Sequence, residues 1–226
     1  EASRSLLTLR YPDYEILIVN DGSNDATLEV LRSTYRLQPA PRFPLASIPT
    51  APVRAIYQSQ THSNLWVIDK ENGKRADAIN AGINYCQTPL LCIVDADGII
   101  EPEALMRIVR PFLEDARTVA SGGIIRVVNG CNVEDGLVQE VRLPRNWLAR
   151  FQVVEYLRSF LAGRVGWDAL KMMLLISGAF GLFRRDLVVA VGGLAHYSIG
   201  EDFELTVRLH RYCREWRIPY GIHFVP

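Results

Sequence analysis

Acidic side chains stand at three places in this sequence where an α/β protein would present them to a ligand. Two of these places follow short apolar runs, and the third opens a stretch with helical spacing. The residues are Asp21 after the first run, Asp95 and Asp97 after the second, and Glu201 with Asp202 at the predicted helix start. Ligands of α/β proteins bind just beyond the carboxyl ends of strands. These five carboxylates are therefore the candidate functional residues.

The Asp95-Ala96-Asp97 spacing favours a site for a divalent metal ion. Two carboxylates one residue apart at a strand end can point into one cleft. Mg²⁺ and Mn²⁺ prefer hard oxygen ligands, and phosphate oxygens often complete a shell that holds few protein ligands. An ion held there would neutralise a diphosphate leaving group. The structural alternative is that these residues only form a turn, because Asp and Gly are common turn residues.

The other carboxylates also have structural alternatives. Asp21 lies in the turn-rich stretch 20–25, where Asp25 is expected to act only in turn or N-cap chemistry. Asp21 is the better ligand candidate because it directly follows the strand. Glu201 and Asp202 either complement the dipole of the helix that they open, or include a general base that takes a proton from an attacking hydroxyl.

The elements that must position these residues alternate between strand and helix patterns, as in an α/β fold. The run 90–94 is nearly all apolar, which is typical of a central parallel strand. Strands are predicted at Tyr14–Val19, Asn64–Ile68, Leu90–Val94, Val119–Val128 and Ile222–Val225, and helices at Ala26–Tyr35, Lys74–Cys86, Glu101–Leu113, Trp147–Leu161 and Phe203–Trp216. The proline-rich segment 36–56 is predicted to be an irregular insertion.

Composition excludes several classes of protein. A length of 226 residues suits one domain or at most two small ones. Lys plus Arg equals Asp plus Glu, so we expect no nucleic-acid partner. No apolar stretch reaches the roughly 18 residues of a membrane-spanning helix. The four cysteines are scattered, so we interpret them as reduced thiols.

The predicted helix Trp147–Leu161 combines aromatic and aliphatic residues with arginines. It is interpreted as an ordinary amphipathic helix that packs on the core. The alternative is a helix that lies on a membrane surface, because a basic face beside Trp and Phe suits that role.

Taken together, the motifs resemble those of family 2 glycosyltransferases of the inverting, GT-A kind. The resemblance covers nearly the whole chain and is strongest to membrane-associated polysaccharide synthases of the poly-N-acetylglucosamine, hyaluronan and cellulose type. It is carried by the segments Ile18–Ser23, Asn72–Gly82, Val94–Asp97, Ser177–Phe180 and Gly200–Leu205.

The resemblance implies an α/β, Rossmann-like GT-A fold with a mixed, mostly parallel central sheet flanked by helices. It also implies that residues 1–226 form a single glycosyltransferase catalytic domain truncated at both ends. The family's first nucleotide-binding strand and the Gln-x-x-Arg-Trp motif of processive synthases do not occur in these residues. The fragment by itself is therefore expected to bind its donor weakly or to be inactive.

By resemblance, Asp21 contacts the uracil or ribose of a uridine diphosphate (UDP) sugar donor. Lys74 or Arg75 lies near the nucleotide, and Arg75 aligns with a lysine of the family. Asp95 assists nucleotide or sugar binding, and Asp97 with Asp95 coordinates Mg²⁺ or Mn²⁺.

The acceptor side and the base follow from the same resemblance. Ser177 and Gly178 are expected among the binding residues and line the acceptor side. Asp202 is the expected catalytic base, with Glu201 beside it. The implied reaction is an inverting transfer, with UDP-N-acetylglucosamine as the guessed donor and a growing polysaccharide or another sugar as acceptor. The parent protein is expected to be membrane-embedded, with this domain at the cytoplasmic face of the cell membrane.

Two other functions remain open. A phosphatase of the haloacid-dehalogenase type also places Asp-x-Asp-Gly after an apolar strand, but Ile99 stands where Thr or Val is expected, and the motif lies mid-chain. A non-catalytic nucleotide-sugar-binding domain is the second alternative.

Overall fold

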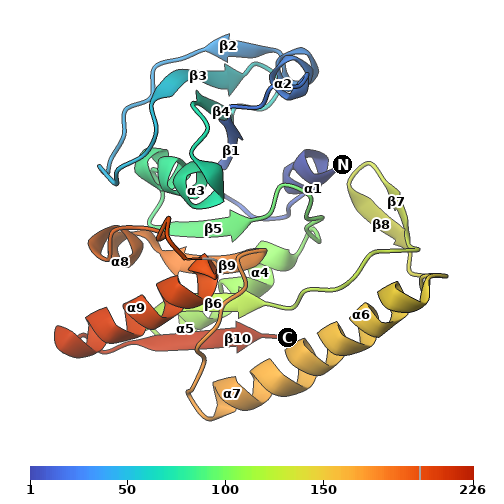
Figure 1. Ribbon diagram of the computed structural model, residues 1–226, viewed down its shortest axis with the longest axis vertical. Coiled ribbons are helices and arrows are strands. Elements are labelled where there is room, and N and C mark those ends of the chain that lie inside the picture. The colour runs from blue at the N-terminus through green and yellow to red at the C-terminus, as the bar shows by residue number, and fades with distance from the viewer. Residues whose placement is uncertain (199) are drawn as a thin grey trace. The chain divides into compact units, whose positions relative to one another are not determined.

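The computed structural model describes residues 1–198 and 200–226, and its chain folds into two compact units (Figure 1). Unit 1 comprises Glu1–Pro12, Cys92–Phe183 and His210–Pro226. Unit 2 comprises Asp13–Leu91 and Arg184–Leu209. Each unit therefore combines segments that are distant in sequence. The single catalytic domain expected from the sequence stays a prediction.

Unit 2 is built on a four-stranded sheet in the order β1-β4-β3-β2. The strands are β1 (Ile16–Asp21), β4 (Leu65–Lys70), β3 (Val53–Ser59) and β2 (Leu37–Pro39). β1 and β4 run parallel, whereas β3 runs antiparallel to β4 and to β2. Leu65, Val67 and Ile68 are fully buried, and each contributes about 1.5–3 kcal/mol by burial. The apolar pattern that predicted the strand also forms the core.

The helices of unit 2 are α2 (Thr27–Tyr35), α3 (Lys74–Tyr85), α8 (Arg185–Ala190) and the start of α9 (Glu201–Glu215). α3 packs against β1 and buries Ala76, Ala81 and Ile83. α2 ends where Arg36 adopts a left-handed conformation with φ of 49°. The helices predicted at Ala26–Tyr35, Lys74–Cys86 and Phe203–Trp216 are confirmed to within two residues at each end.

The segment 36–56 is only partly irregular. It contains β2 and the first residues of β3, because antiparallel pairing with neighbouring strands supplies their backbone hydrogen bonds. Between them, residues 40–52 contain no helix or strand but are held by side chains. Asn84 bonds both the N–H and the C=O of Ile48 at 2.9 Å, and the buried Arg42 pairs with Glu15 at 2.7 Å.

Unit 1 contains a sheet in the order β10-β6-β9-β5, and β5 is where the chain passes from one unit to the other. The strands are β5 (Leu90–Val94), β6 (Thr118–Gly123), β9 (Phe180–Arg184) and β10 (Gly221–Val225). β6 runs parallel to β10 and antiparallel to β9. The mixed α/β fold expected from the sequence is confirmed. Strands β2–β3, β3–β4 and β6–β9 pair antiparallel, whereas β1–β4 and β6–β10 pair parallel.

Unit 1 also contains several short helices and a hairpin. They are α1 (Ala2–Leu7), α4 (Ala104–Ile108), α5 (Arg110–Glu114), β7 (Asn132–Glu134), β8 (Leu137–Glu140) and α7 (Val165–Ala169). The single helix predicted at Glu101–Leu113 is wrong in detail, because it breaks into α4 and α5 next to Pro111. Proline cannot donate the helical hydrogen bond and restricts the residue before it. The strand predicted to reach Val128 ends at Gly123.

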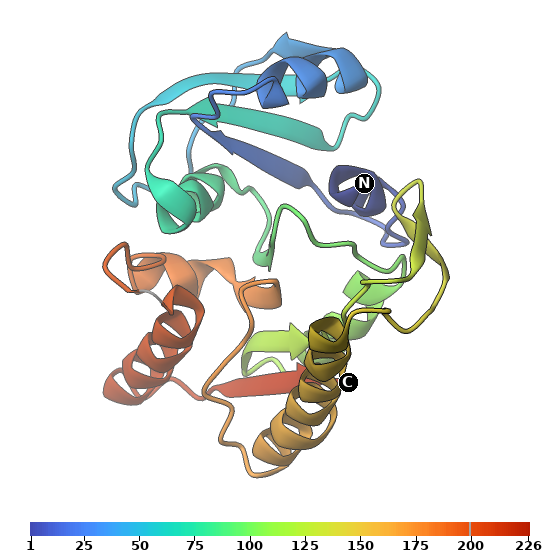
Figure 2. The same ribbon diagram turned by 45° about the vertical axis from the view of Figure 1, so that its right-hand side comes forward.

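α6 (Trp147–Leu157) continues through a π-helical segment (Arg158–Arg164) into α7, and both views show one long rod that runs past β10 (Figure 1, Figure 2). Asn146 caps its start by accepting from the N–H of Leu148. No residue of α6 is buried, and Trp147 and Phe151 are 71% and 68% exposed. The interpretation of the predicted helix Trp147–Leu161 as core-packed is therefore wrong for α6, whereas Phe160 in the π-helical segment is buried, with its ring 6.2 Å from that of Phe224.

Candidate functional site

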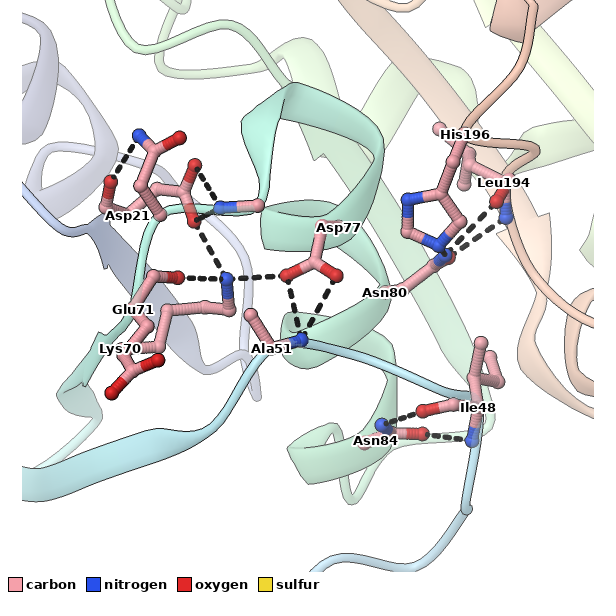
Figure 3. A network of polar contacts seen from close by, with 12 residues as sticks. Asp21, Ile48, Ala51, Lys70, Glu71, Asp77, Asn80, Asn84, Leu194 and His196 are labelled. Atoms are coloured by element: carbon pink, nitrogen blue, oxygen red, sulfur yellow. Dashed lines mark hydrogen bonds and ion pairs between the residues drawn. The ribbon is translucent and has the colours of Figure 1, made fainter.

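The first part of the candidate site lies in unit 2, where β1 and β4 end together. Their parallel register pairs Asp21 with Lys70. The Lys70 Nζ donates to Oδ1 of Asp21 at 2.6 Å and to the carbonyl of Glu71 at 2.6 Å (Figure 3). It also forms an ion pair with Asp77 in the first turn of α3. The ends of two strands and the start of a helix are thus joined by one ammonium group.

The three charged side chains of this cluster, Lys70, Asp77 and Asp21, differ in how far they are buried. The Lys70 side chain is 0% exposed and Asp77 is 8% exposed, whereas Asp21 is 19% exposed. Burial by itself lowers the pKa of the Lys70 ammonium, but the hydrogen bonds and charges of Asp21 and Asp77 outweigh that effect. The pKa of Lys70 is therefore raised above that of an ordinary lysine, and the group stays charged.

The chain around Asp21 is also fixed by its backbone. The N–H of Gly73 donates to both Asp21 oxygens, at 3.0 and 3.2 Å, and the Asn72 side chain donates to the Asp21 carbonyl at 2.8 Å. Gly22 adopts a left-handed conformation with φ of 67°, and a Cβ there would lie 2.7 Å from the Asn72 nitrogen. The turn-type residues after β1 therefore hold Asp21 in one orientation.

A polar face of α3 ties the surrounding loops together (Figure 3). Asp77 accepts from the N–H of Ala51 at 3.0 Å, and Asn84 holds Ile48. Asn80 bonds both the N–H and the C=O of Leu194, at 2.7 and 2.9 Å. These three side chains recur at helical spacing and are all buried, so α3 positions loops on two sides of the site.

An ion pair joins Arg75 and Glu201. The family resemblance places Arg75 near the nucleotide and Glu201 beside the expected catalytic base, but it does not link the two. The Glu201 side chain is 14% exposed and that of Arg75 is 41% exposed. Lys74 is exposed at the start of α3 and has a φ of 70°. The ion pair connects the first turns of α3 and α9, which carry Arg75 and Asp202.

Asp202 lies next to that ion pair in the first turn of α9. Its Oδ1 accepts from the N–H of Phe203 at 2.8 Å, and its carbonyl accepts from the Thr206 hydroxyl at 2.9 Å. The side chain is half-buried. An acidic side chain at a helix N-terminus is stabilised by the helix dipole, so the structural and the catalytic readings of Asp202 are compatible.

Asp95 and Asp97 belong to unit 1 and follow β5 directly. The N–H of Gly98 donates to the Asp95 carbonyl at 3.0 Å, which closes a turn and leaves Asp97 exposed. Among the described residues, no three His, Cys, Asp or Glu side chains are grouped to hold a metal ion. Two carboxylates nevertheless fit Mg²⁺ or Mn²⁺ if diphosphate oxygens complete the shell.

Ser177 and Gly178 are also in unit 1, in the turn that leads into β9. The Ser177 hydroxyl accepts from the N–H of Ala179 at 3.4 Å, and its carbonyl accepts from Phe180 at 3.2 Å. Both residues are half-buried. Hydrogen bonds within the turn itself hold it in place. The expectation that Ser177 and Gly178 line the acceptor side stays a prediction.

Lys70 and Asp77 were missed by the sequence reasoning. A signal was present, because Lys70 follows the predicted strand Asn64–Ile68 at the same distance at which Asp21 follows Tyr14–Val19. Asp77, Asn80 and Asn84 follow the spacing of one helix face, which is unusual for three polar residues on a core-facing side. Their partners could only be assigned once β1 and β4 were paired.

Comparisons with known proteins agree with the motifs. A family model described as "Glycosyltransferase like family 2" matches residues 50–224, and one described as "Glycosyl transferase family 2" matches residues 1–42. The poly-beta-1,6-N-acetyl-D-glucosamine synthase of Staphylococcus aureus (strain COL) is 26% identical over 217 residues, which are 96% of this chain and 43% of that protein. The enzyme of that name from Staphylococcus epidermidis is 25% identical over 212 residues, covering 93% and 42%. The chain spans less than half the length of these curated relatives.

A solved structure shows the same fold. It is the mannosyltransferase PcManGT from Pyrobaculum calidifontis in complex with GDP-Man and Mn²⁺, with a TM-score of 0.62 and 16% identity. The match covers 100% of this chain and 52% of the other. It confirms the GT-A type of α/β fold. Because the first family model covers well over half of the sequence, the chain belongs to glycosyltransferase family 2.

Proposed function

We propose that this protein transfers a sugar from a UDP-sugar to a growing polysaccharide or another sugar acceptor, with inversion at the anomeric carbon. The observation that carries the proposal is the placement of Asp21 at the carboxyl end of strand β1, and of Asp95 with Asp97 just after strand β5, in a family 2 glycosyltransferase. Such strand ends are where α/β enzymes bind nucleotides.

The donor and acceptor are proposed from the relatives. Both cited relatives are named for synthesis of poly-β-1,6-N-acetylglucosamine, so UDP-N-acetylglucosamine and a polysaccharide are the first candidates. Asp21 would accept a hydrogen bond from the uracil or ribose. Arg75 would approach the nucleotide, and Ser177 and Gly178 would line the acceptor side.

In the proposed reaction, Asp202 removes the proton from an acceptor hydroxyl. The hydroxyl oxygen then forms a bond to the anomeric carbon while the bond from that carbon to the diphosphate breaks on the opposite face. Asp97, with Asp95, would hold Mg²⁺ or Mn²⁺, which stabilises the charge of the leaving diphosphate. Arg75 would keep Glu201 paired, so that Glu201 does not compete for the proton.

We also propose that the domain works at the cytoplasmic face of the cell membrane in a membrane-embedded parent. In the described part of the chain, no helix is long and apolar enough to cross a bilayer. Support comes from α6, whose exposed Trp147, Leu148 and Phe151 lie near arginines. Exposed aromatic and aliphatic residues beside basic ones suit a helix that lies on a lipid surface.

The experiment uses the full-length protein, a panel of nucleotide sugars, and Asp97→Ala and Asp202→Asn variants. We expect Asp97→Ala to abolish Mn²⁺-dependent UDP binding in calorimetry. We expect Asp202→Asn to bind the donor but to lose sugar transfer. Glu114→Ala, at an exposed position on α5, is the matched control and should keep both properties.

The same assays separate the alternatives. Phosphate release from a phosphomonoester without UDP binding would favour a phosphatase. Donor binding without transfer or hydrolysis by the wild type would favour a binding domain. Unchanged UDP binding by Asp97→Ala with and without Mn²⁺ would reject the metal assignment, and retained turnover by Asp202→Asn would reject the base.

A further inference from the structure

We propose that Lys70 and Asp77 are positioning residues that make Asp21 a recognition group for the nucleoside part of the donor, as distinct from its diphosphate. This inference rests on the proposed function, because it concerns the same donor site. Lys70 would act through Asp21 and would not itself touch the ligand.

The hydrogen-bond geometry of Lys70 supports an indirect role. An ammonium group has three hydrogens to donate. In this chain it meets three acceptors: Oδ1 of Asp21, the Asp77 carboxylate and the Glu71 carbonyl. The side chain is also fully buried. Lys70 therefore has neither a hydrogen nor a surface left for a ligand.

The exposure gradient then identifies Asp21 as the ligand-facing member of the cluster. The Asp21 side chain is 19% exposed, whereas those of Asp77 and Lys70 are 8% and 0% exposed. Lys70 holds Oδ1 at 2.6 Å, whereas among the described residues Oδ2 has only the longer 3.2 Å contact from Gly73. Oδ2 is consequently the oxygen best placed to accept a further hydrogen bond.

The charge of the cluster indicates which part of the donor it accepts. Two carboxylates around one ammonium leave a net charge of minus one at the end of β1. A negative group repels phosphate but accepts hydrogen bonds from neutral N–H and O–H groups, and an ionised acceptor strengthens them. Uracil and ribose offer such groups, so Asp21 would select the nucleoside.

A purely structural cluster is the competing interpretation, because Lys70 also joins β1, β4 and α3. The two interpretations differ in what restores binding. Lys70→Met leaves two facing carboxylates without a counter-charge, which also destabilises the fold. The double variant Lys70→Met/Asp77→Asn removes that repulsion but does not restore the clamp on Asp21.

The test measures Kd for UDP and for inorganic diphosphate, both with Mn²⁺, in the full-length protein. We expect Lys70→Met and the double variant to weaken UDP binding about tenfold or more, as loss of an oriented charge-assisted hydrogen bond implies. Their affinity for diphosphate should change less than about twofold. Arg42→Met breaks another buried ion pair, with Glu15, and serves as the control that should keep the UDP-to-diphosphate ratio.

Each outcome decides between the interpretations. A lower UDP-to-diphosphate affinity ratio in both Lys70 variants, with the control unchanged, supports positioning. Recovery of the wild-type ratio in the double variant, or an equal loss for both ligands, overturns it. Absence of UDP binding by the wild type would reject the proposed function itself, and the inference with it.

Discussion

Replacing Lys70 by methionine should destabilise the protein strongly and in a pH-dependent way. The ammonium is fully buried and faces Asp21 and Asp77, so its removal leaves two carboxylates without a counter-charge. Breaking a buried ion pair from one side costs about 3–5 kcal/mol. Because Asp21 retains some contact with water, we expect the lower half of that range.

The pH dependence follows from the direction of the Lys70 shift. Its pKa is raised in the folded protein, since hydrogen bonds and charges of the two carboxylates outweigh the effect of burial. The stabilising contribution is fully present below the unfolded-state pKa of about 10.4, and it is lost as pH rises through the folded pKa. The difference between wild type and Lys70→Met should therefore be constant from pH 7 to 9 and shrink above about pH 10.5.

Urea unfolding followed by circular dichroism at several pH values measures this difference. Arg42→Met is the matched control, because Arg42 is buried and pairs with Glu15, yet a guanidinium does not titrate in this range. Its destabilisation should be independent of pH. A Lys70→Met difference below about 1 kcal/mol at pH 8, the range of surface ion pairs, or one that grows above pH 10.5, would refute the reasoning.

Three further predictions concern other parts of the chain. Gly22→Ala should cost about 1–3 kcal/mol of unfolding free energy, because the left-handed φ of 67° is strained for alanine; an unchanged urea midpoint would contradict it. Phe151→Ser should alter stability by less than about 0.5 kcal/mol because the side chain is exposed. The same variant should lower association with anionic vesicles about tenfold, and equal sedimentation with the wild type would argue against a membrane-facing α6. Cys131 should be alkylated at pH 8 well before Cys92, because burial raises the pKa of the Cys92 thiol to about 12; faster labelling of Cys92 in peptide mass spectra would reject this.

The sequence by itself determined the elements whose signals are local. Strand β5 has the predicted bounds Leu90–Val94, and α3 begins at the predicted Lys74. An all-apolar run predicts a buried strand and a turn-rich stretch predicts a break between elements, and both patterns lie within a few residues. No contact with a distant segment is needed to interpret them. The motifs around Asp21 and Asp95 likewise predicted the family, which the family models confirm.

Tertiary structure alone decided what those residues contact. Lys70 was not singled out from the sequence, and only the β1–β4 register places it beside Asp21. The apolar periodicity of α6 predicted a helix, but it did not predict that the side chains of Trp147 and Phe151 would be exposed. Hydrophobic spacing records which face of an element is apolar, whereas burial and ion pairing depend on segments far apart in the chain. That is why the sequence predicted a carboxylate at the end of β1, and only the fold revealed the buried lysine that orients it.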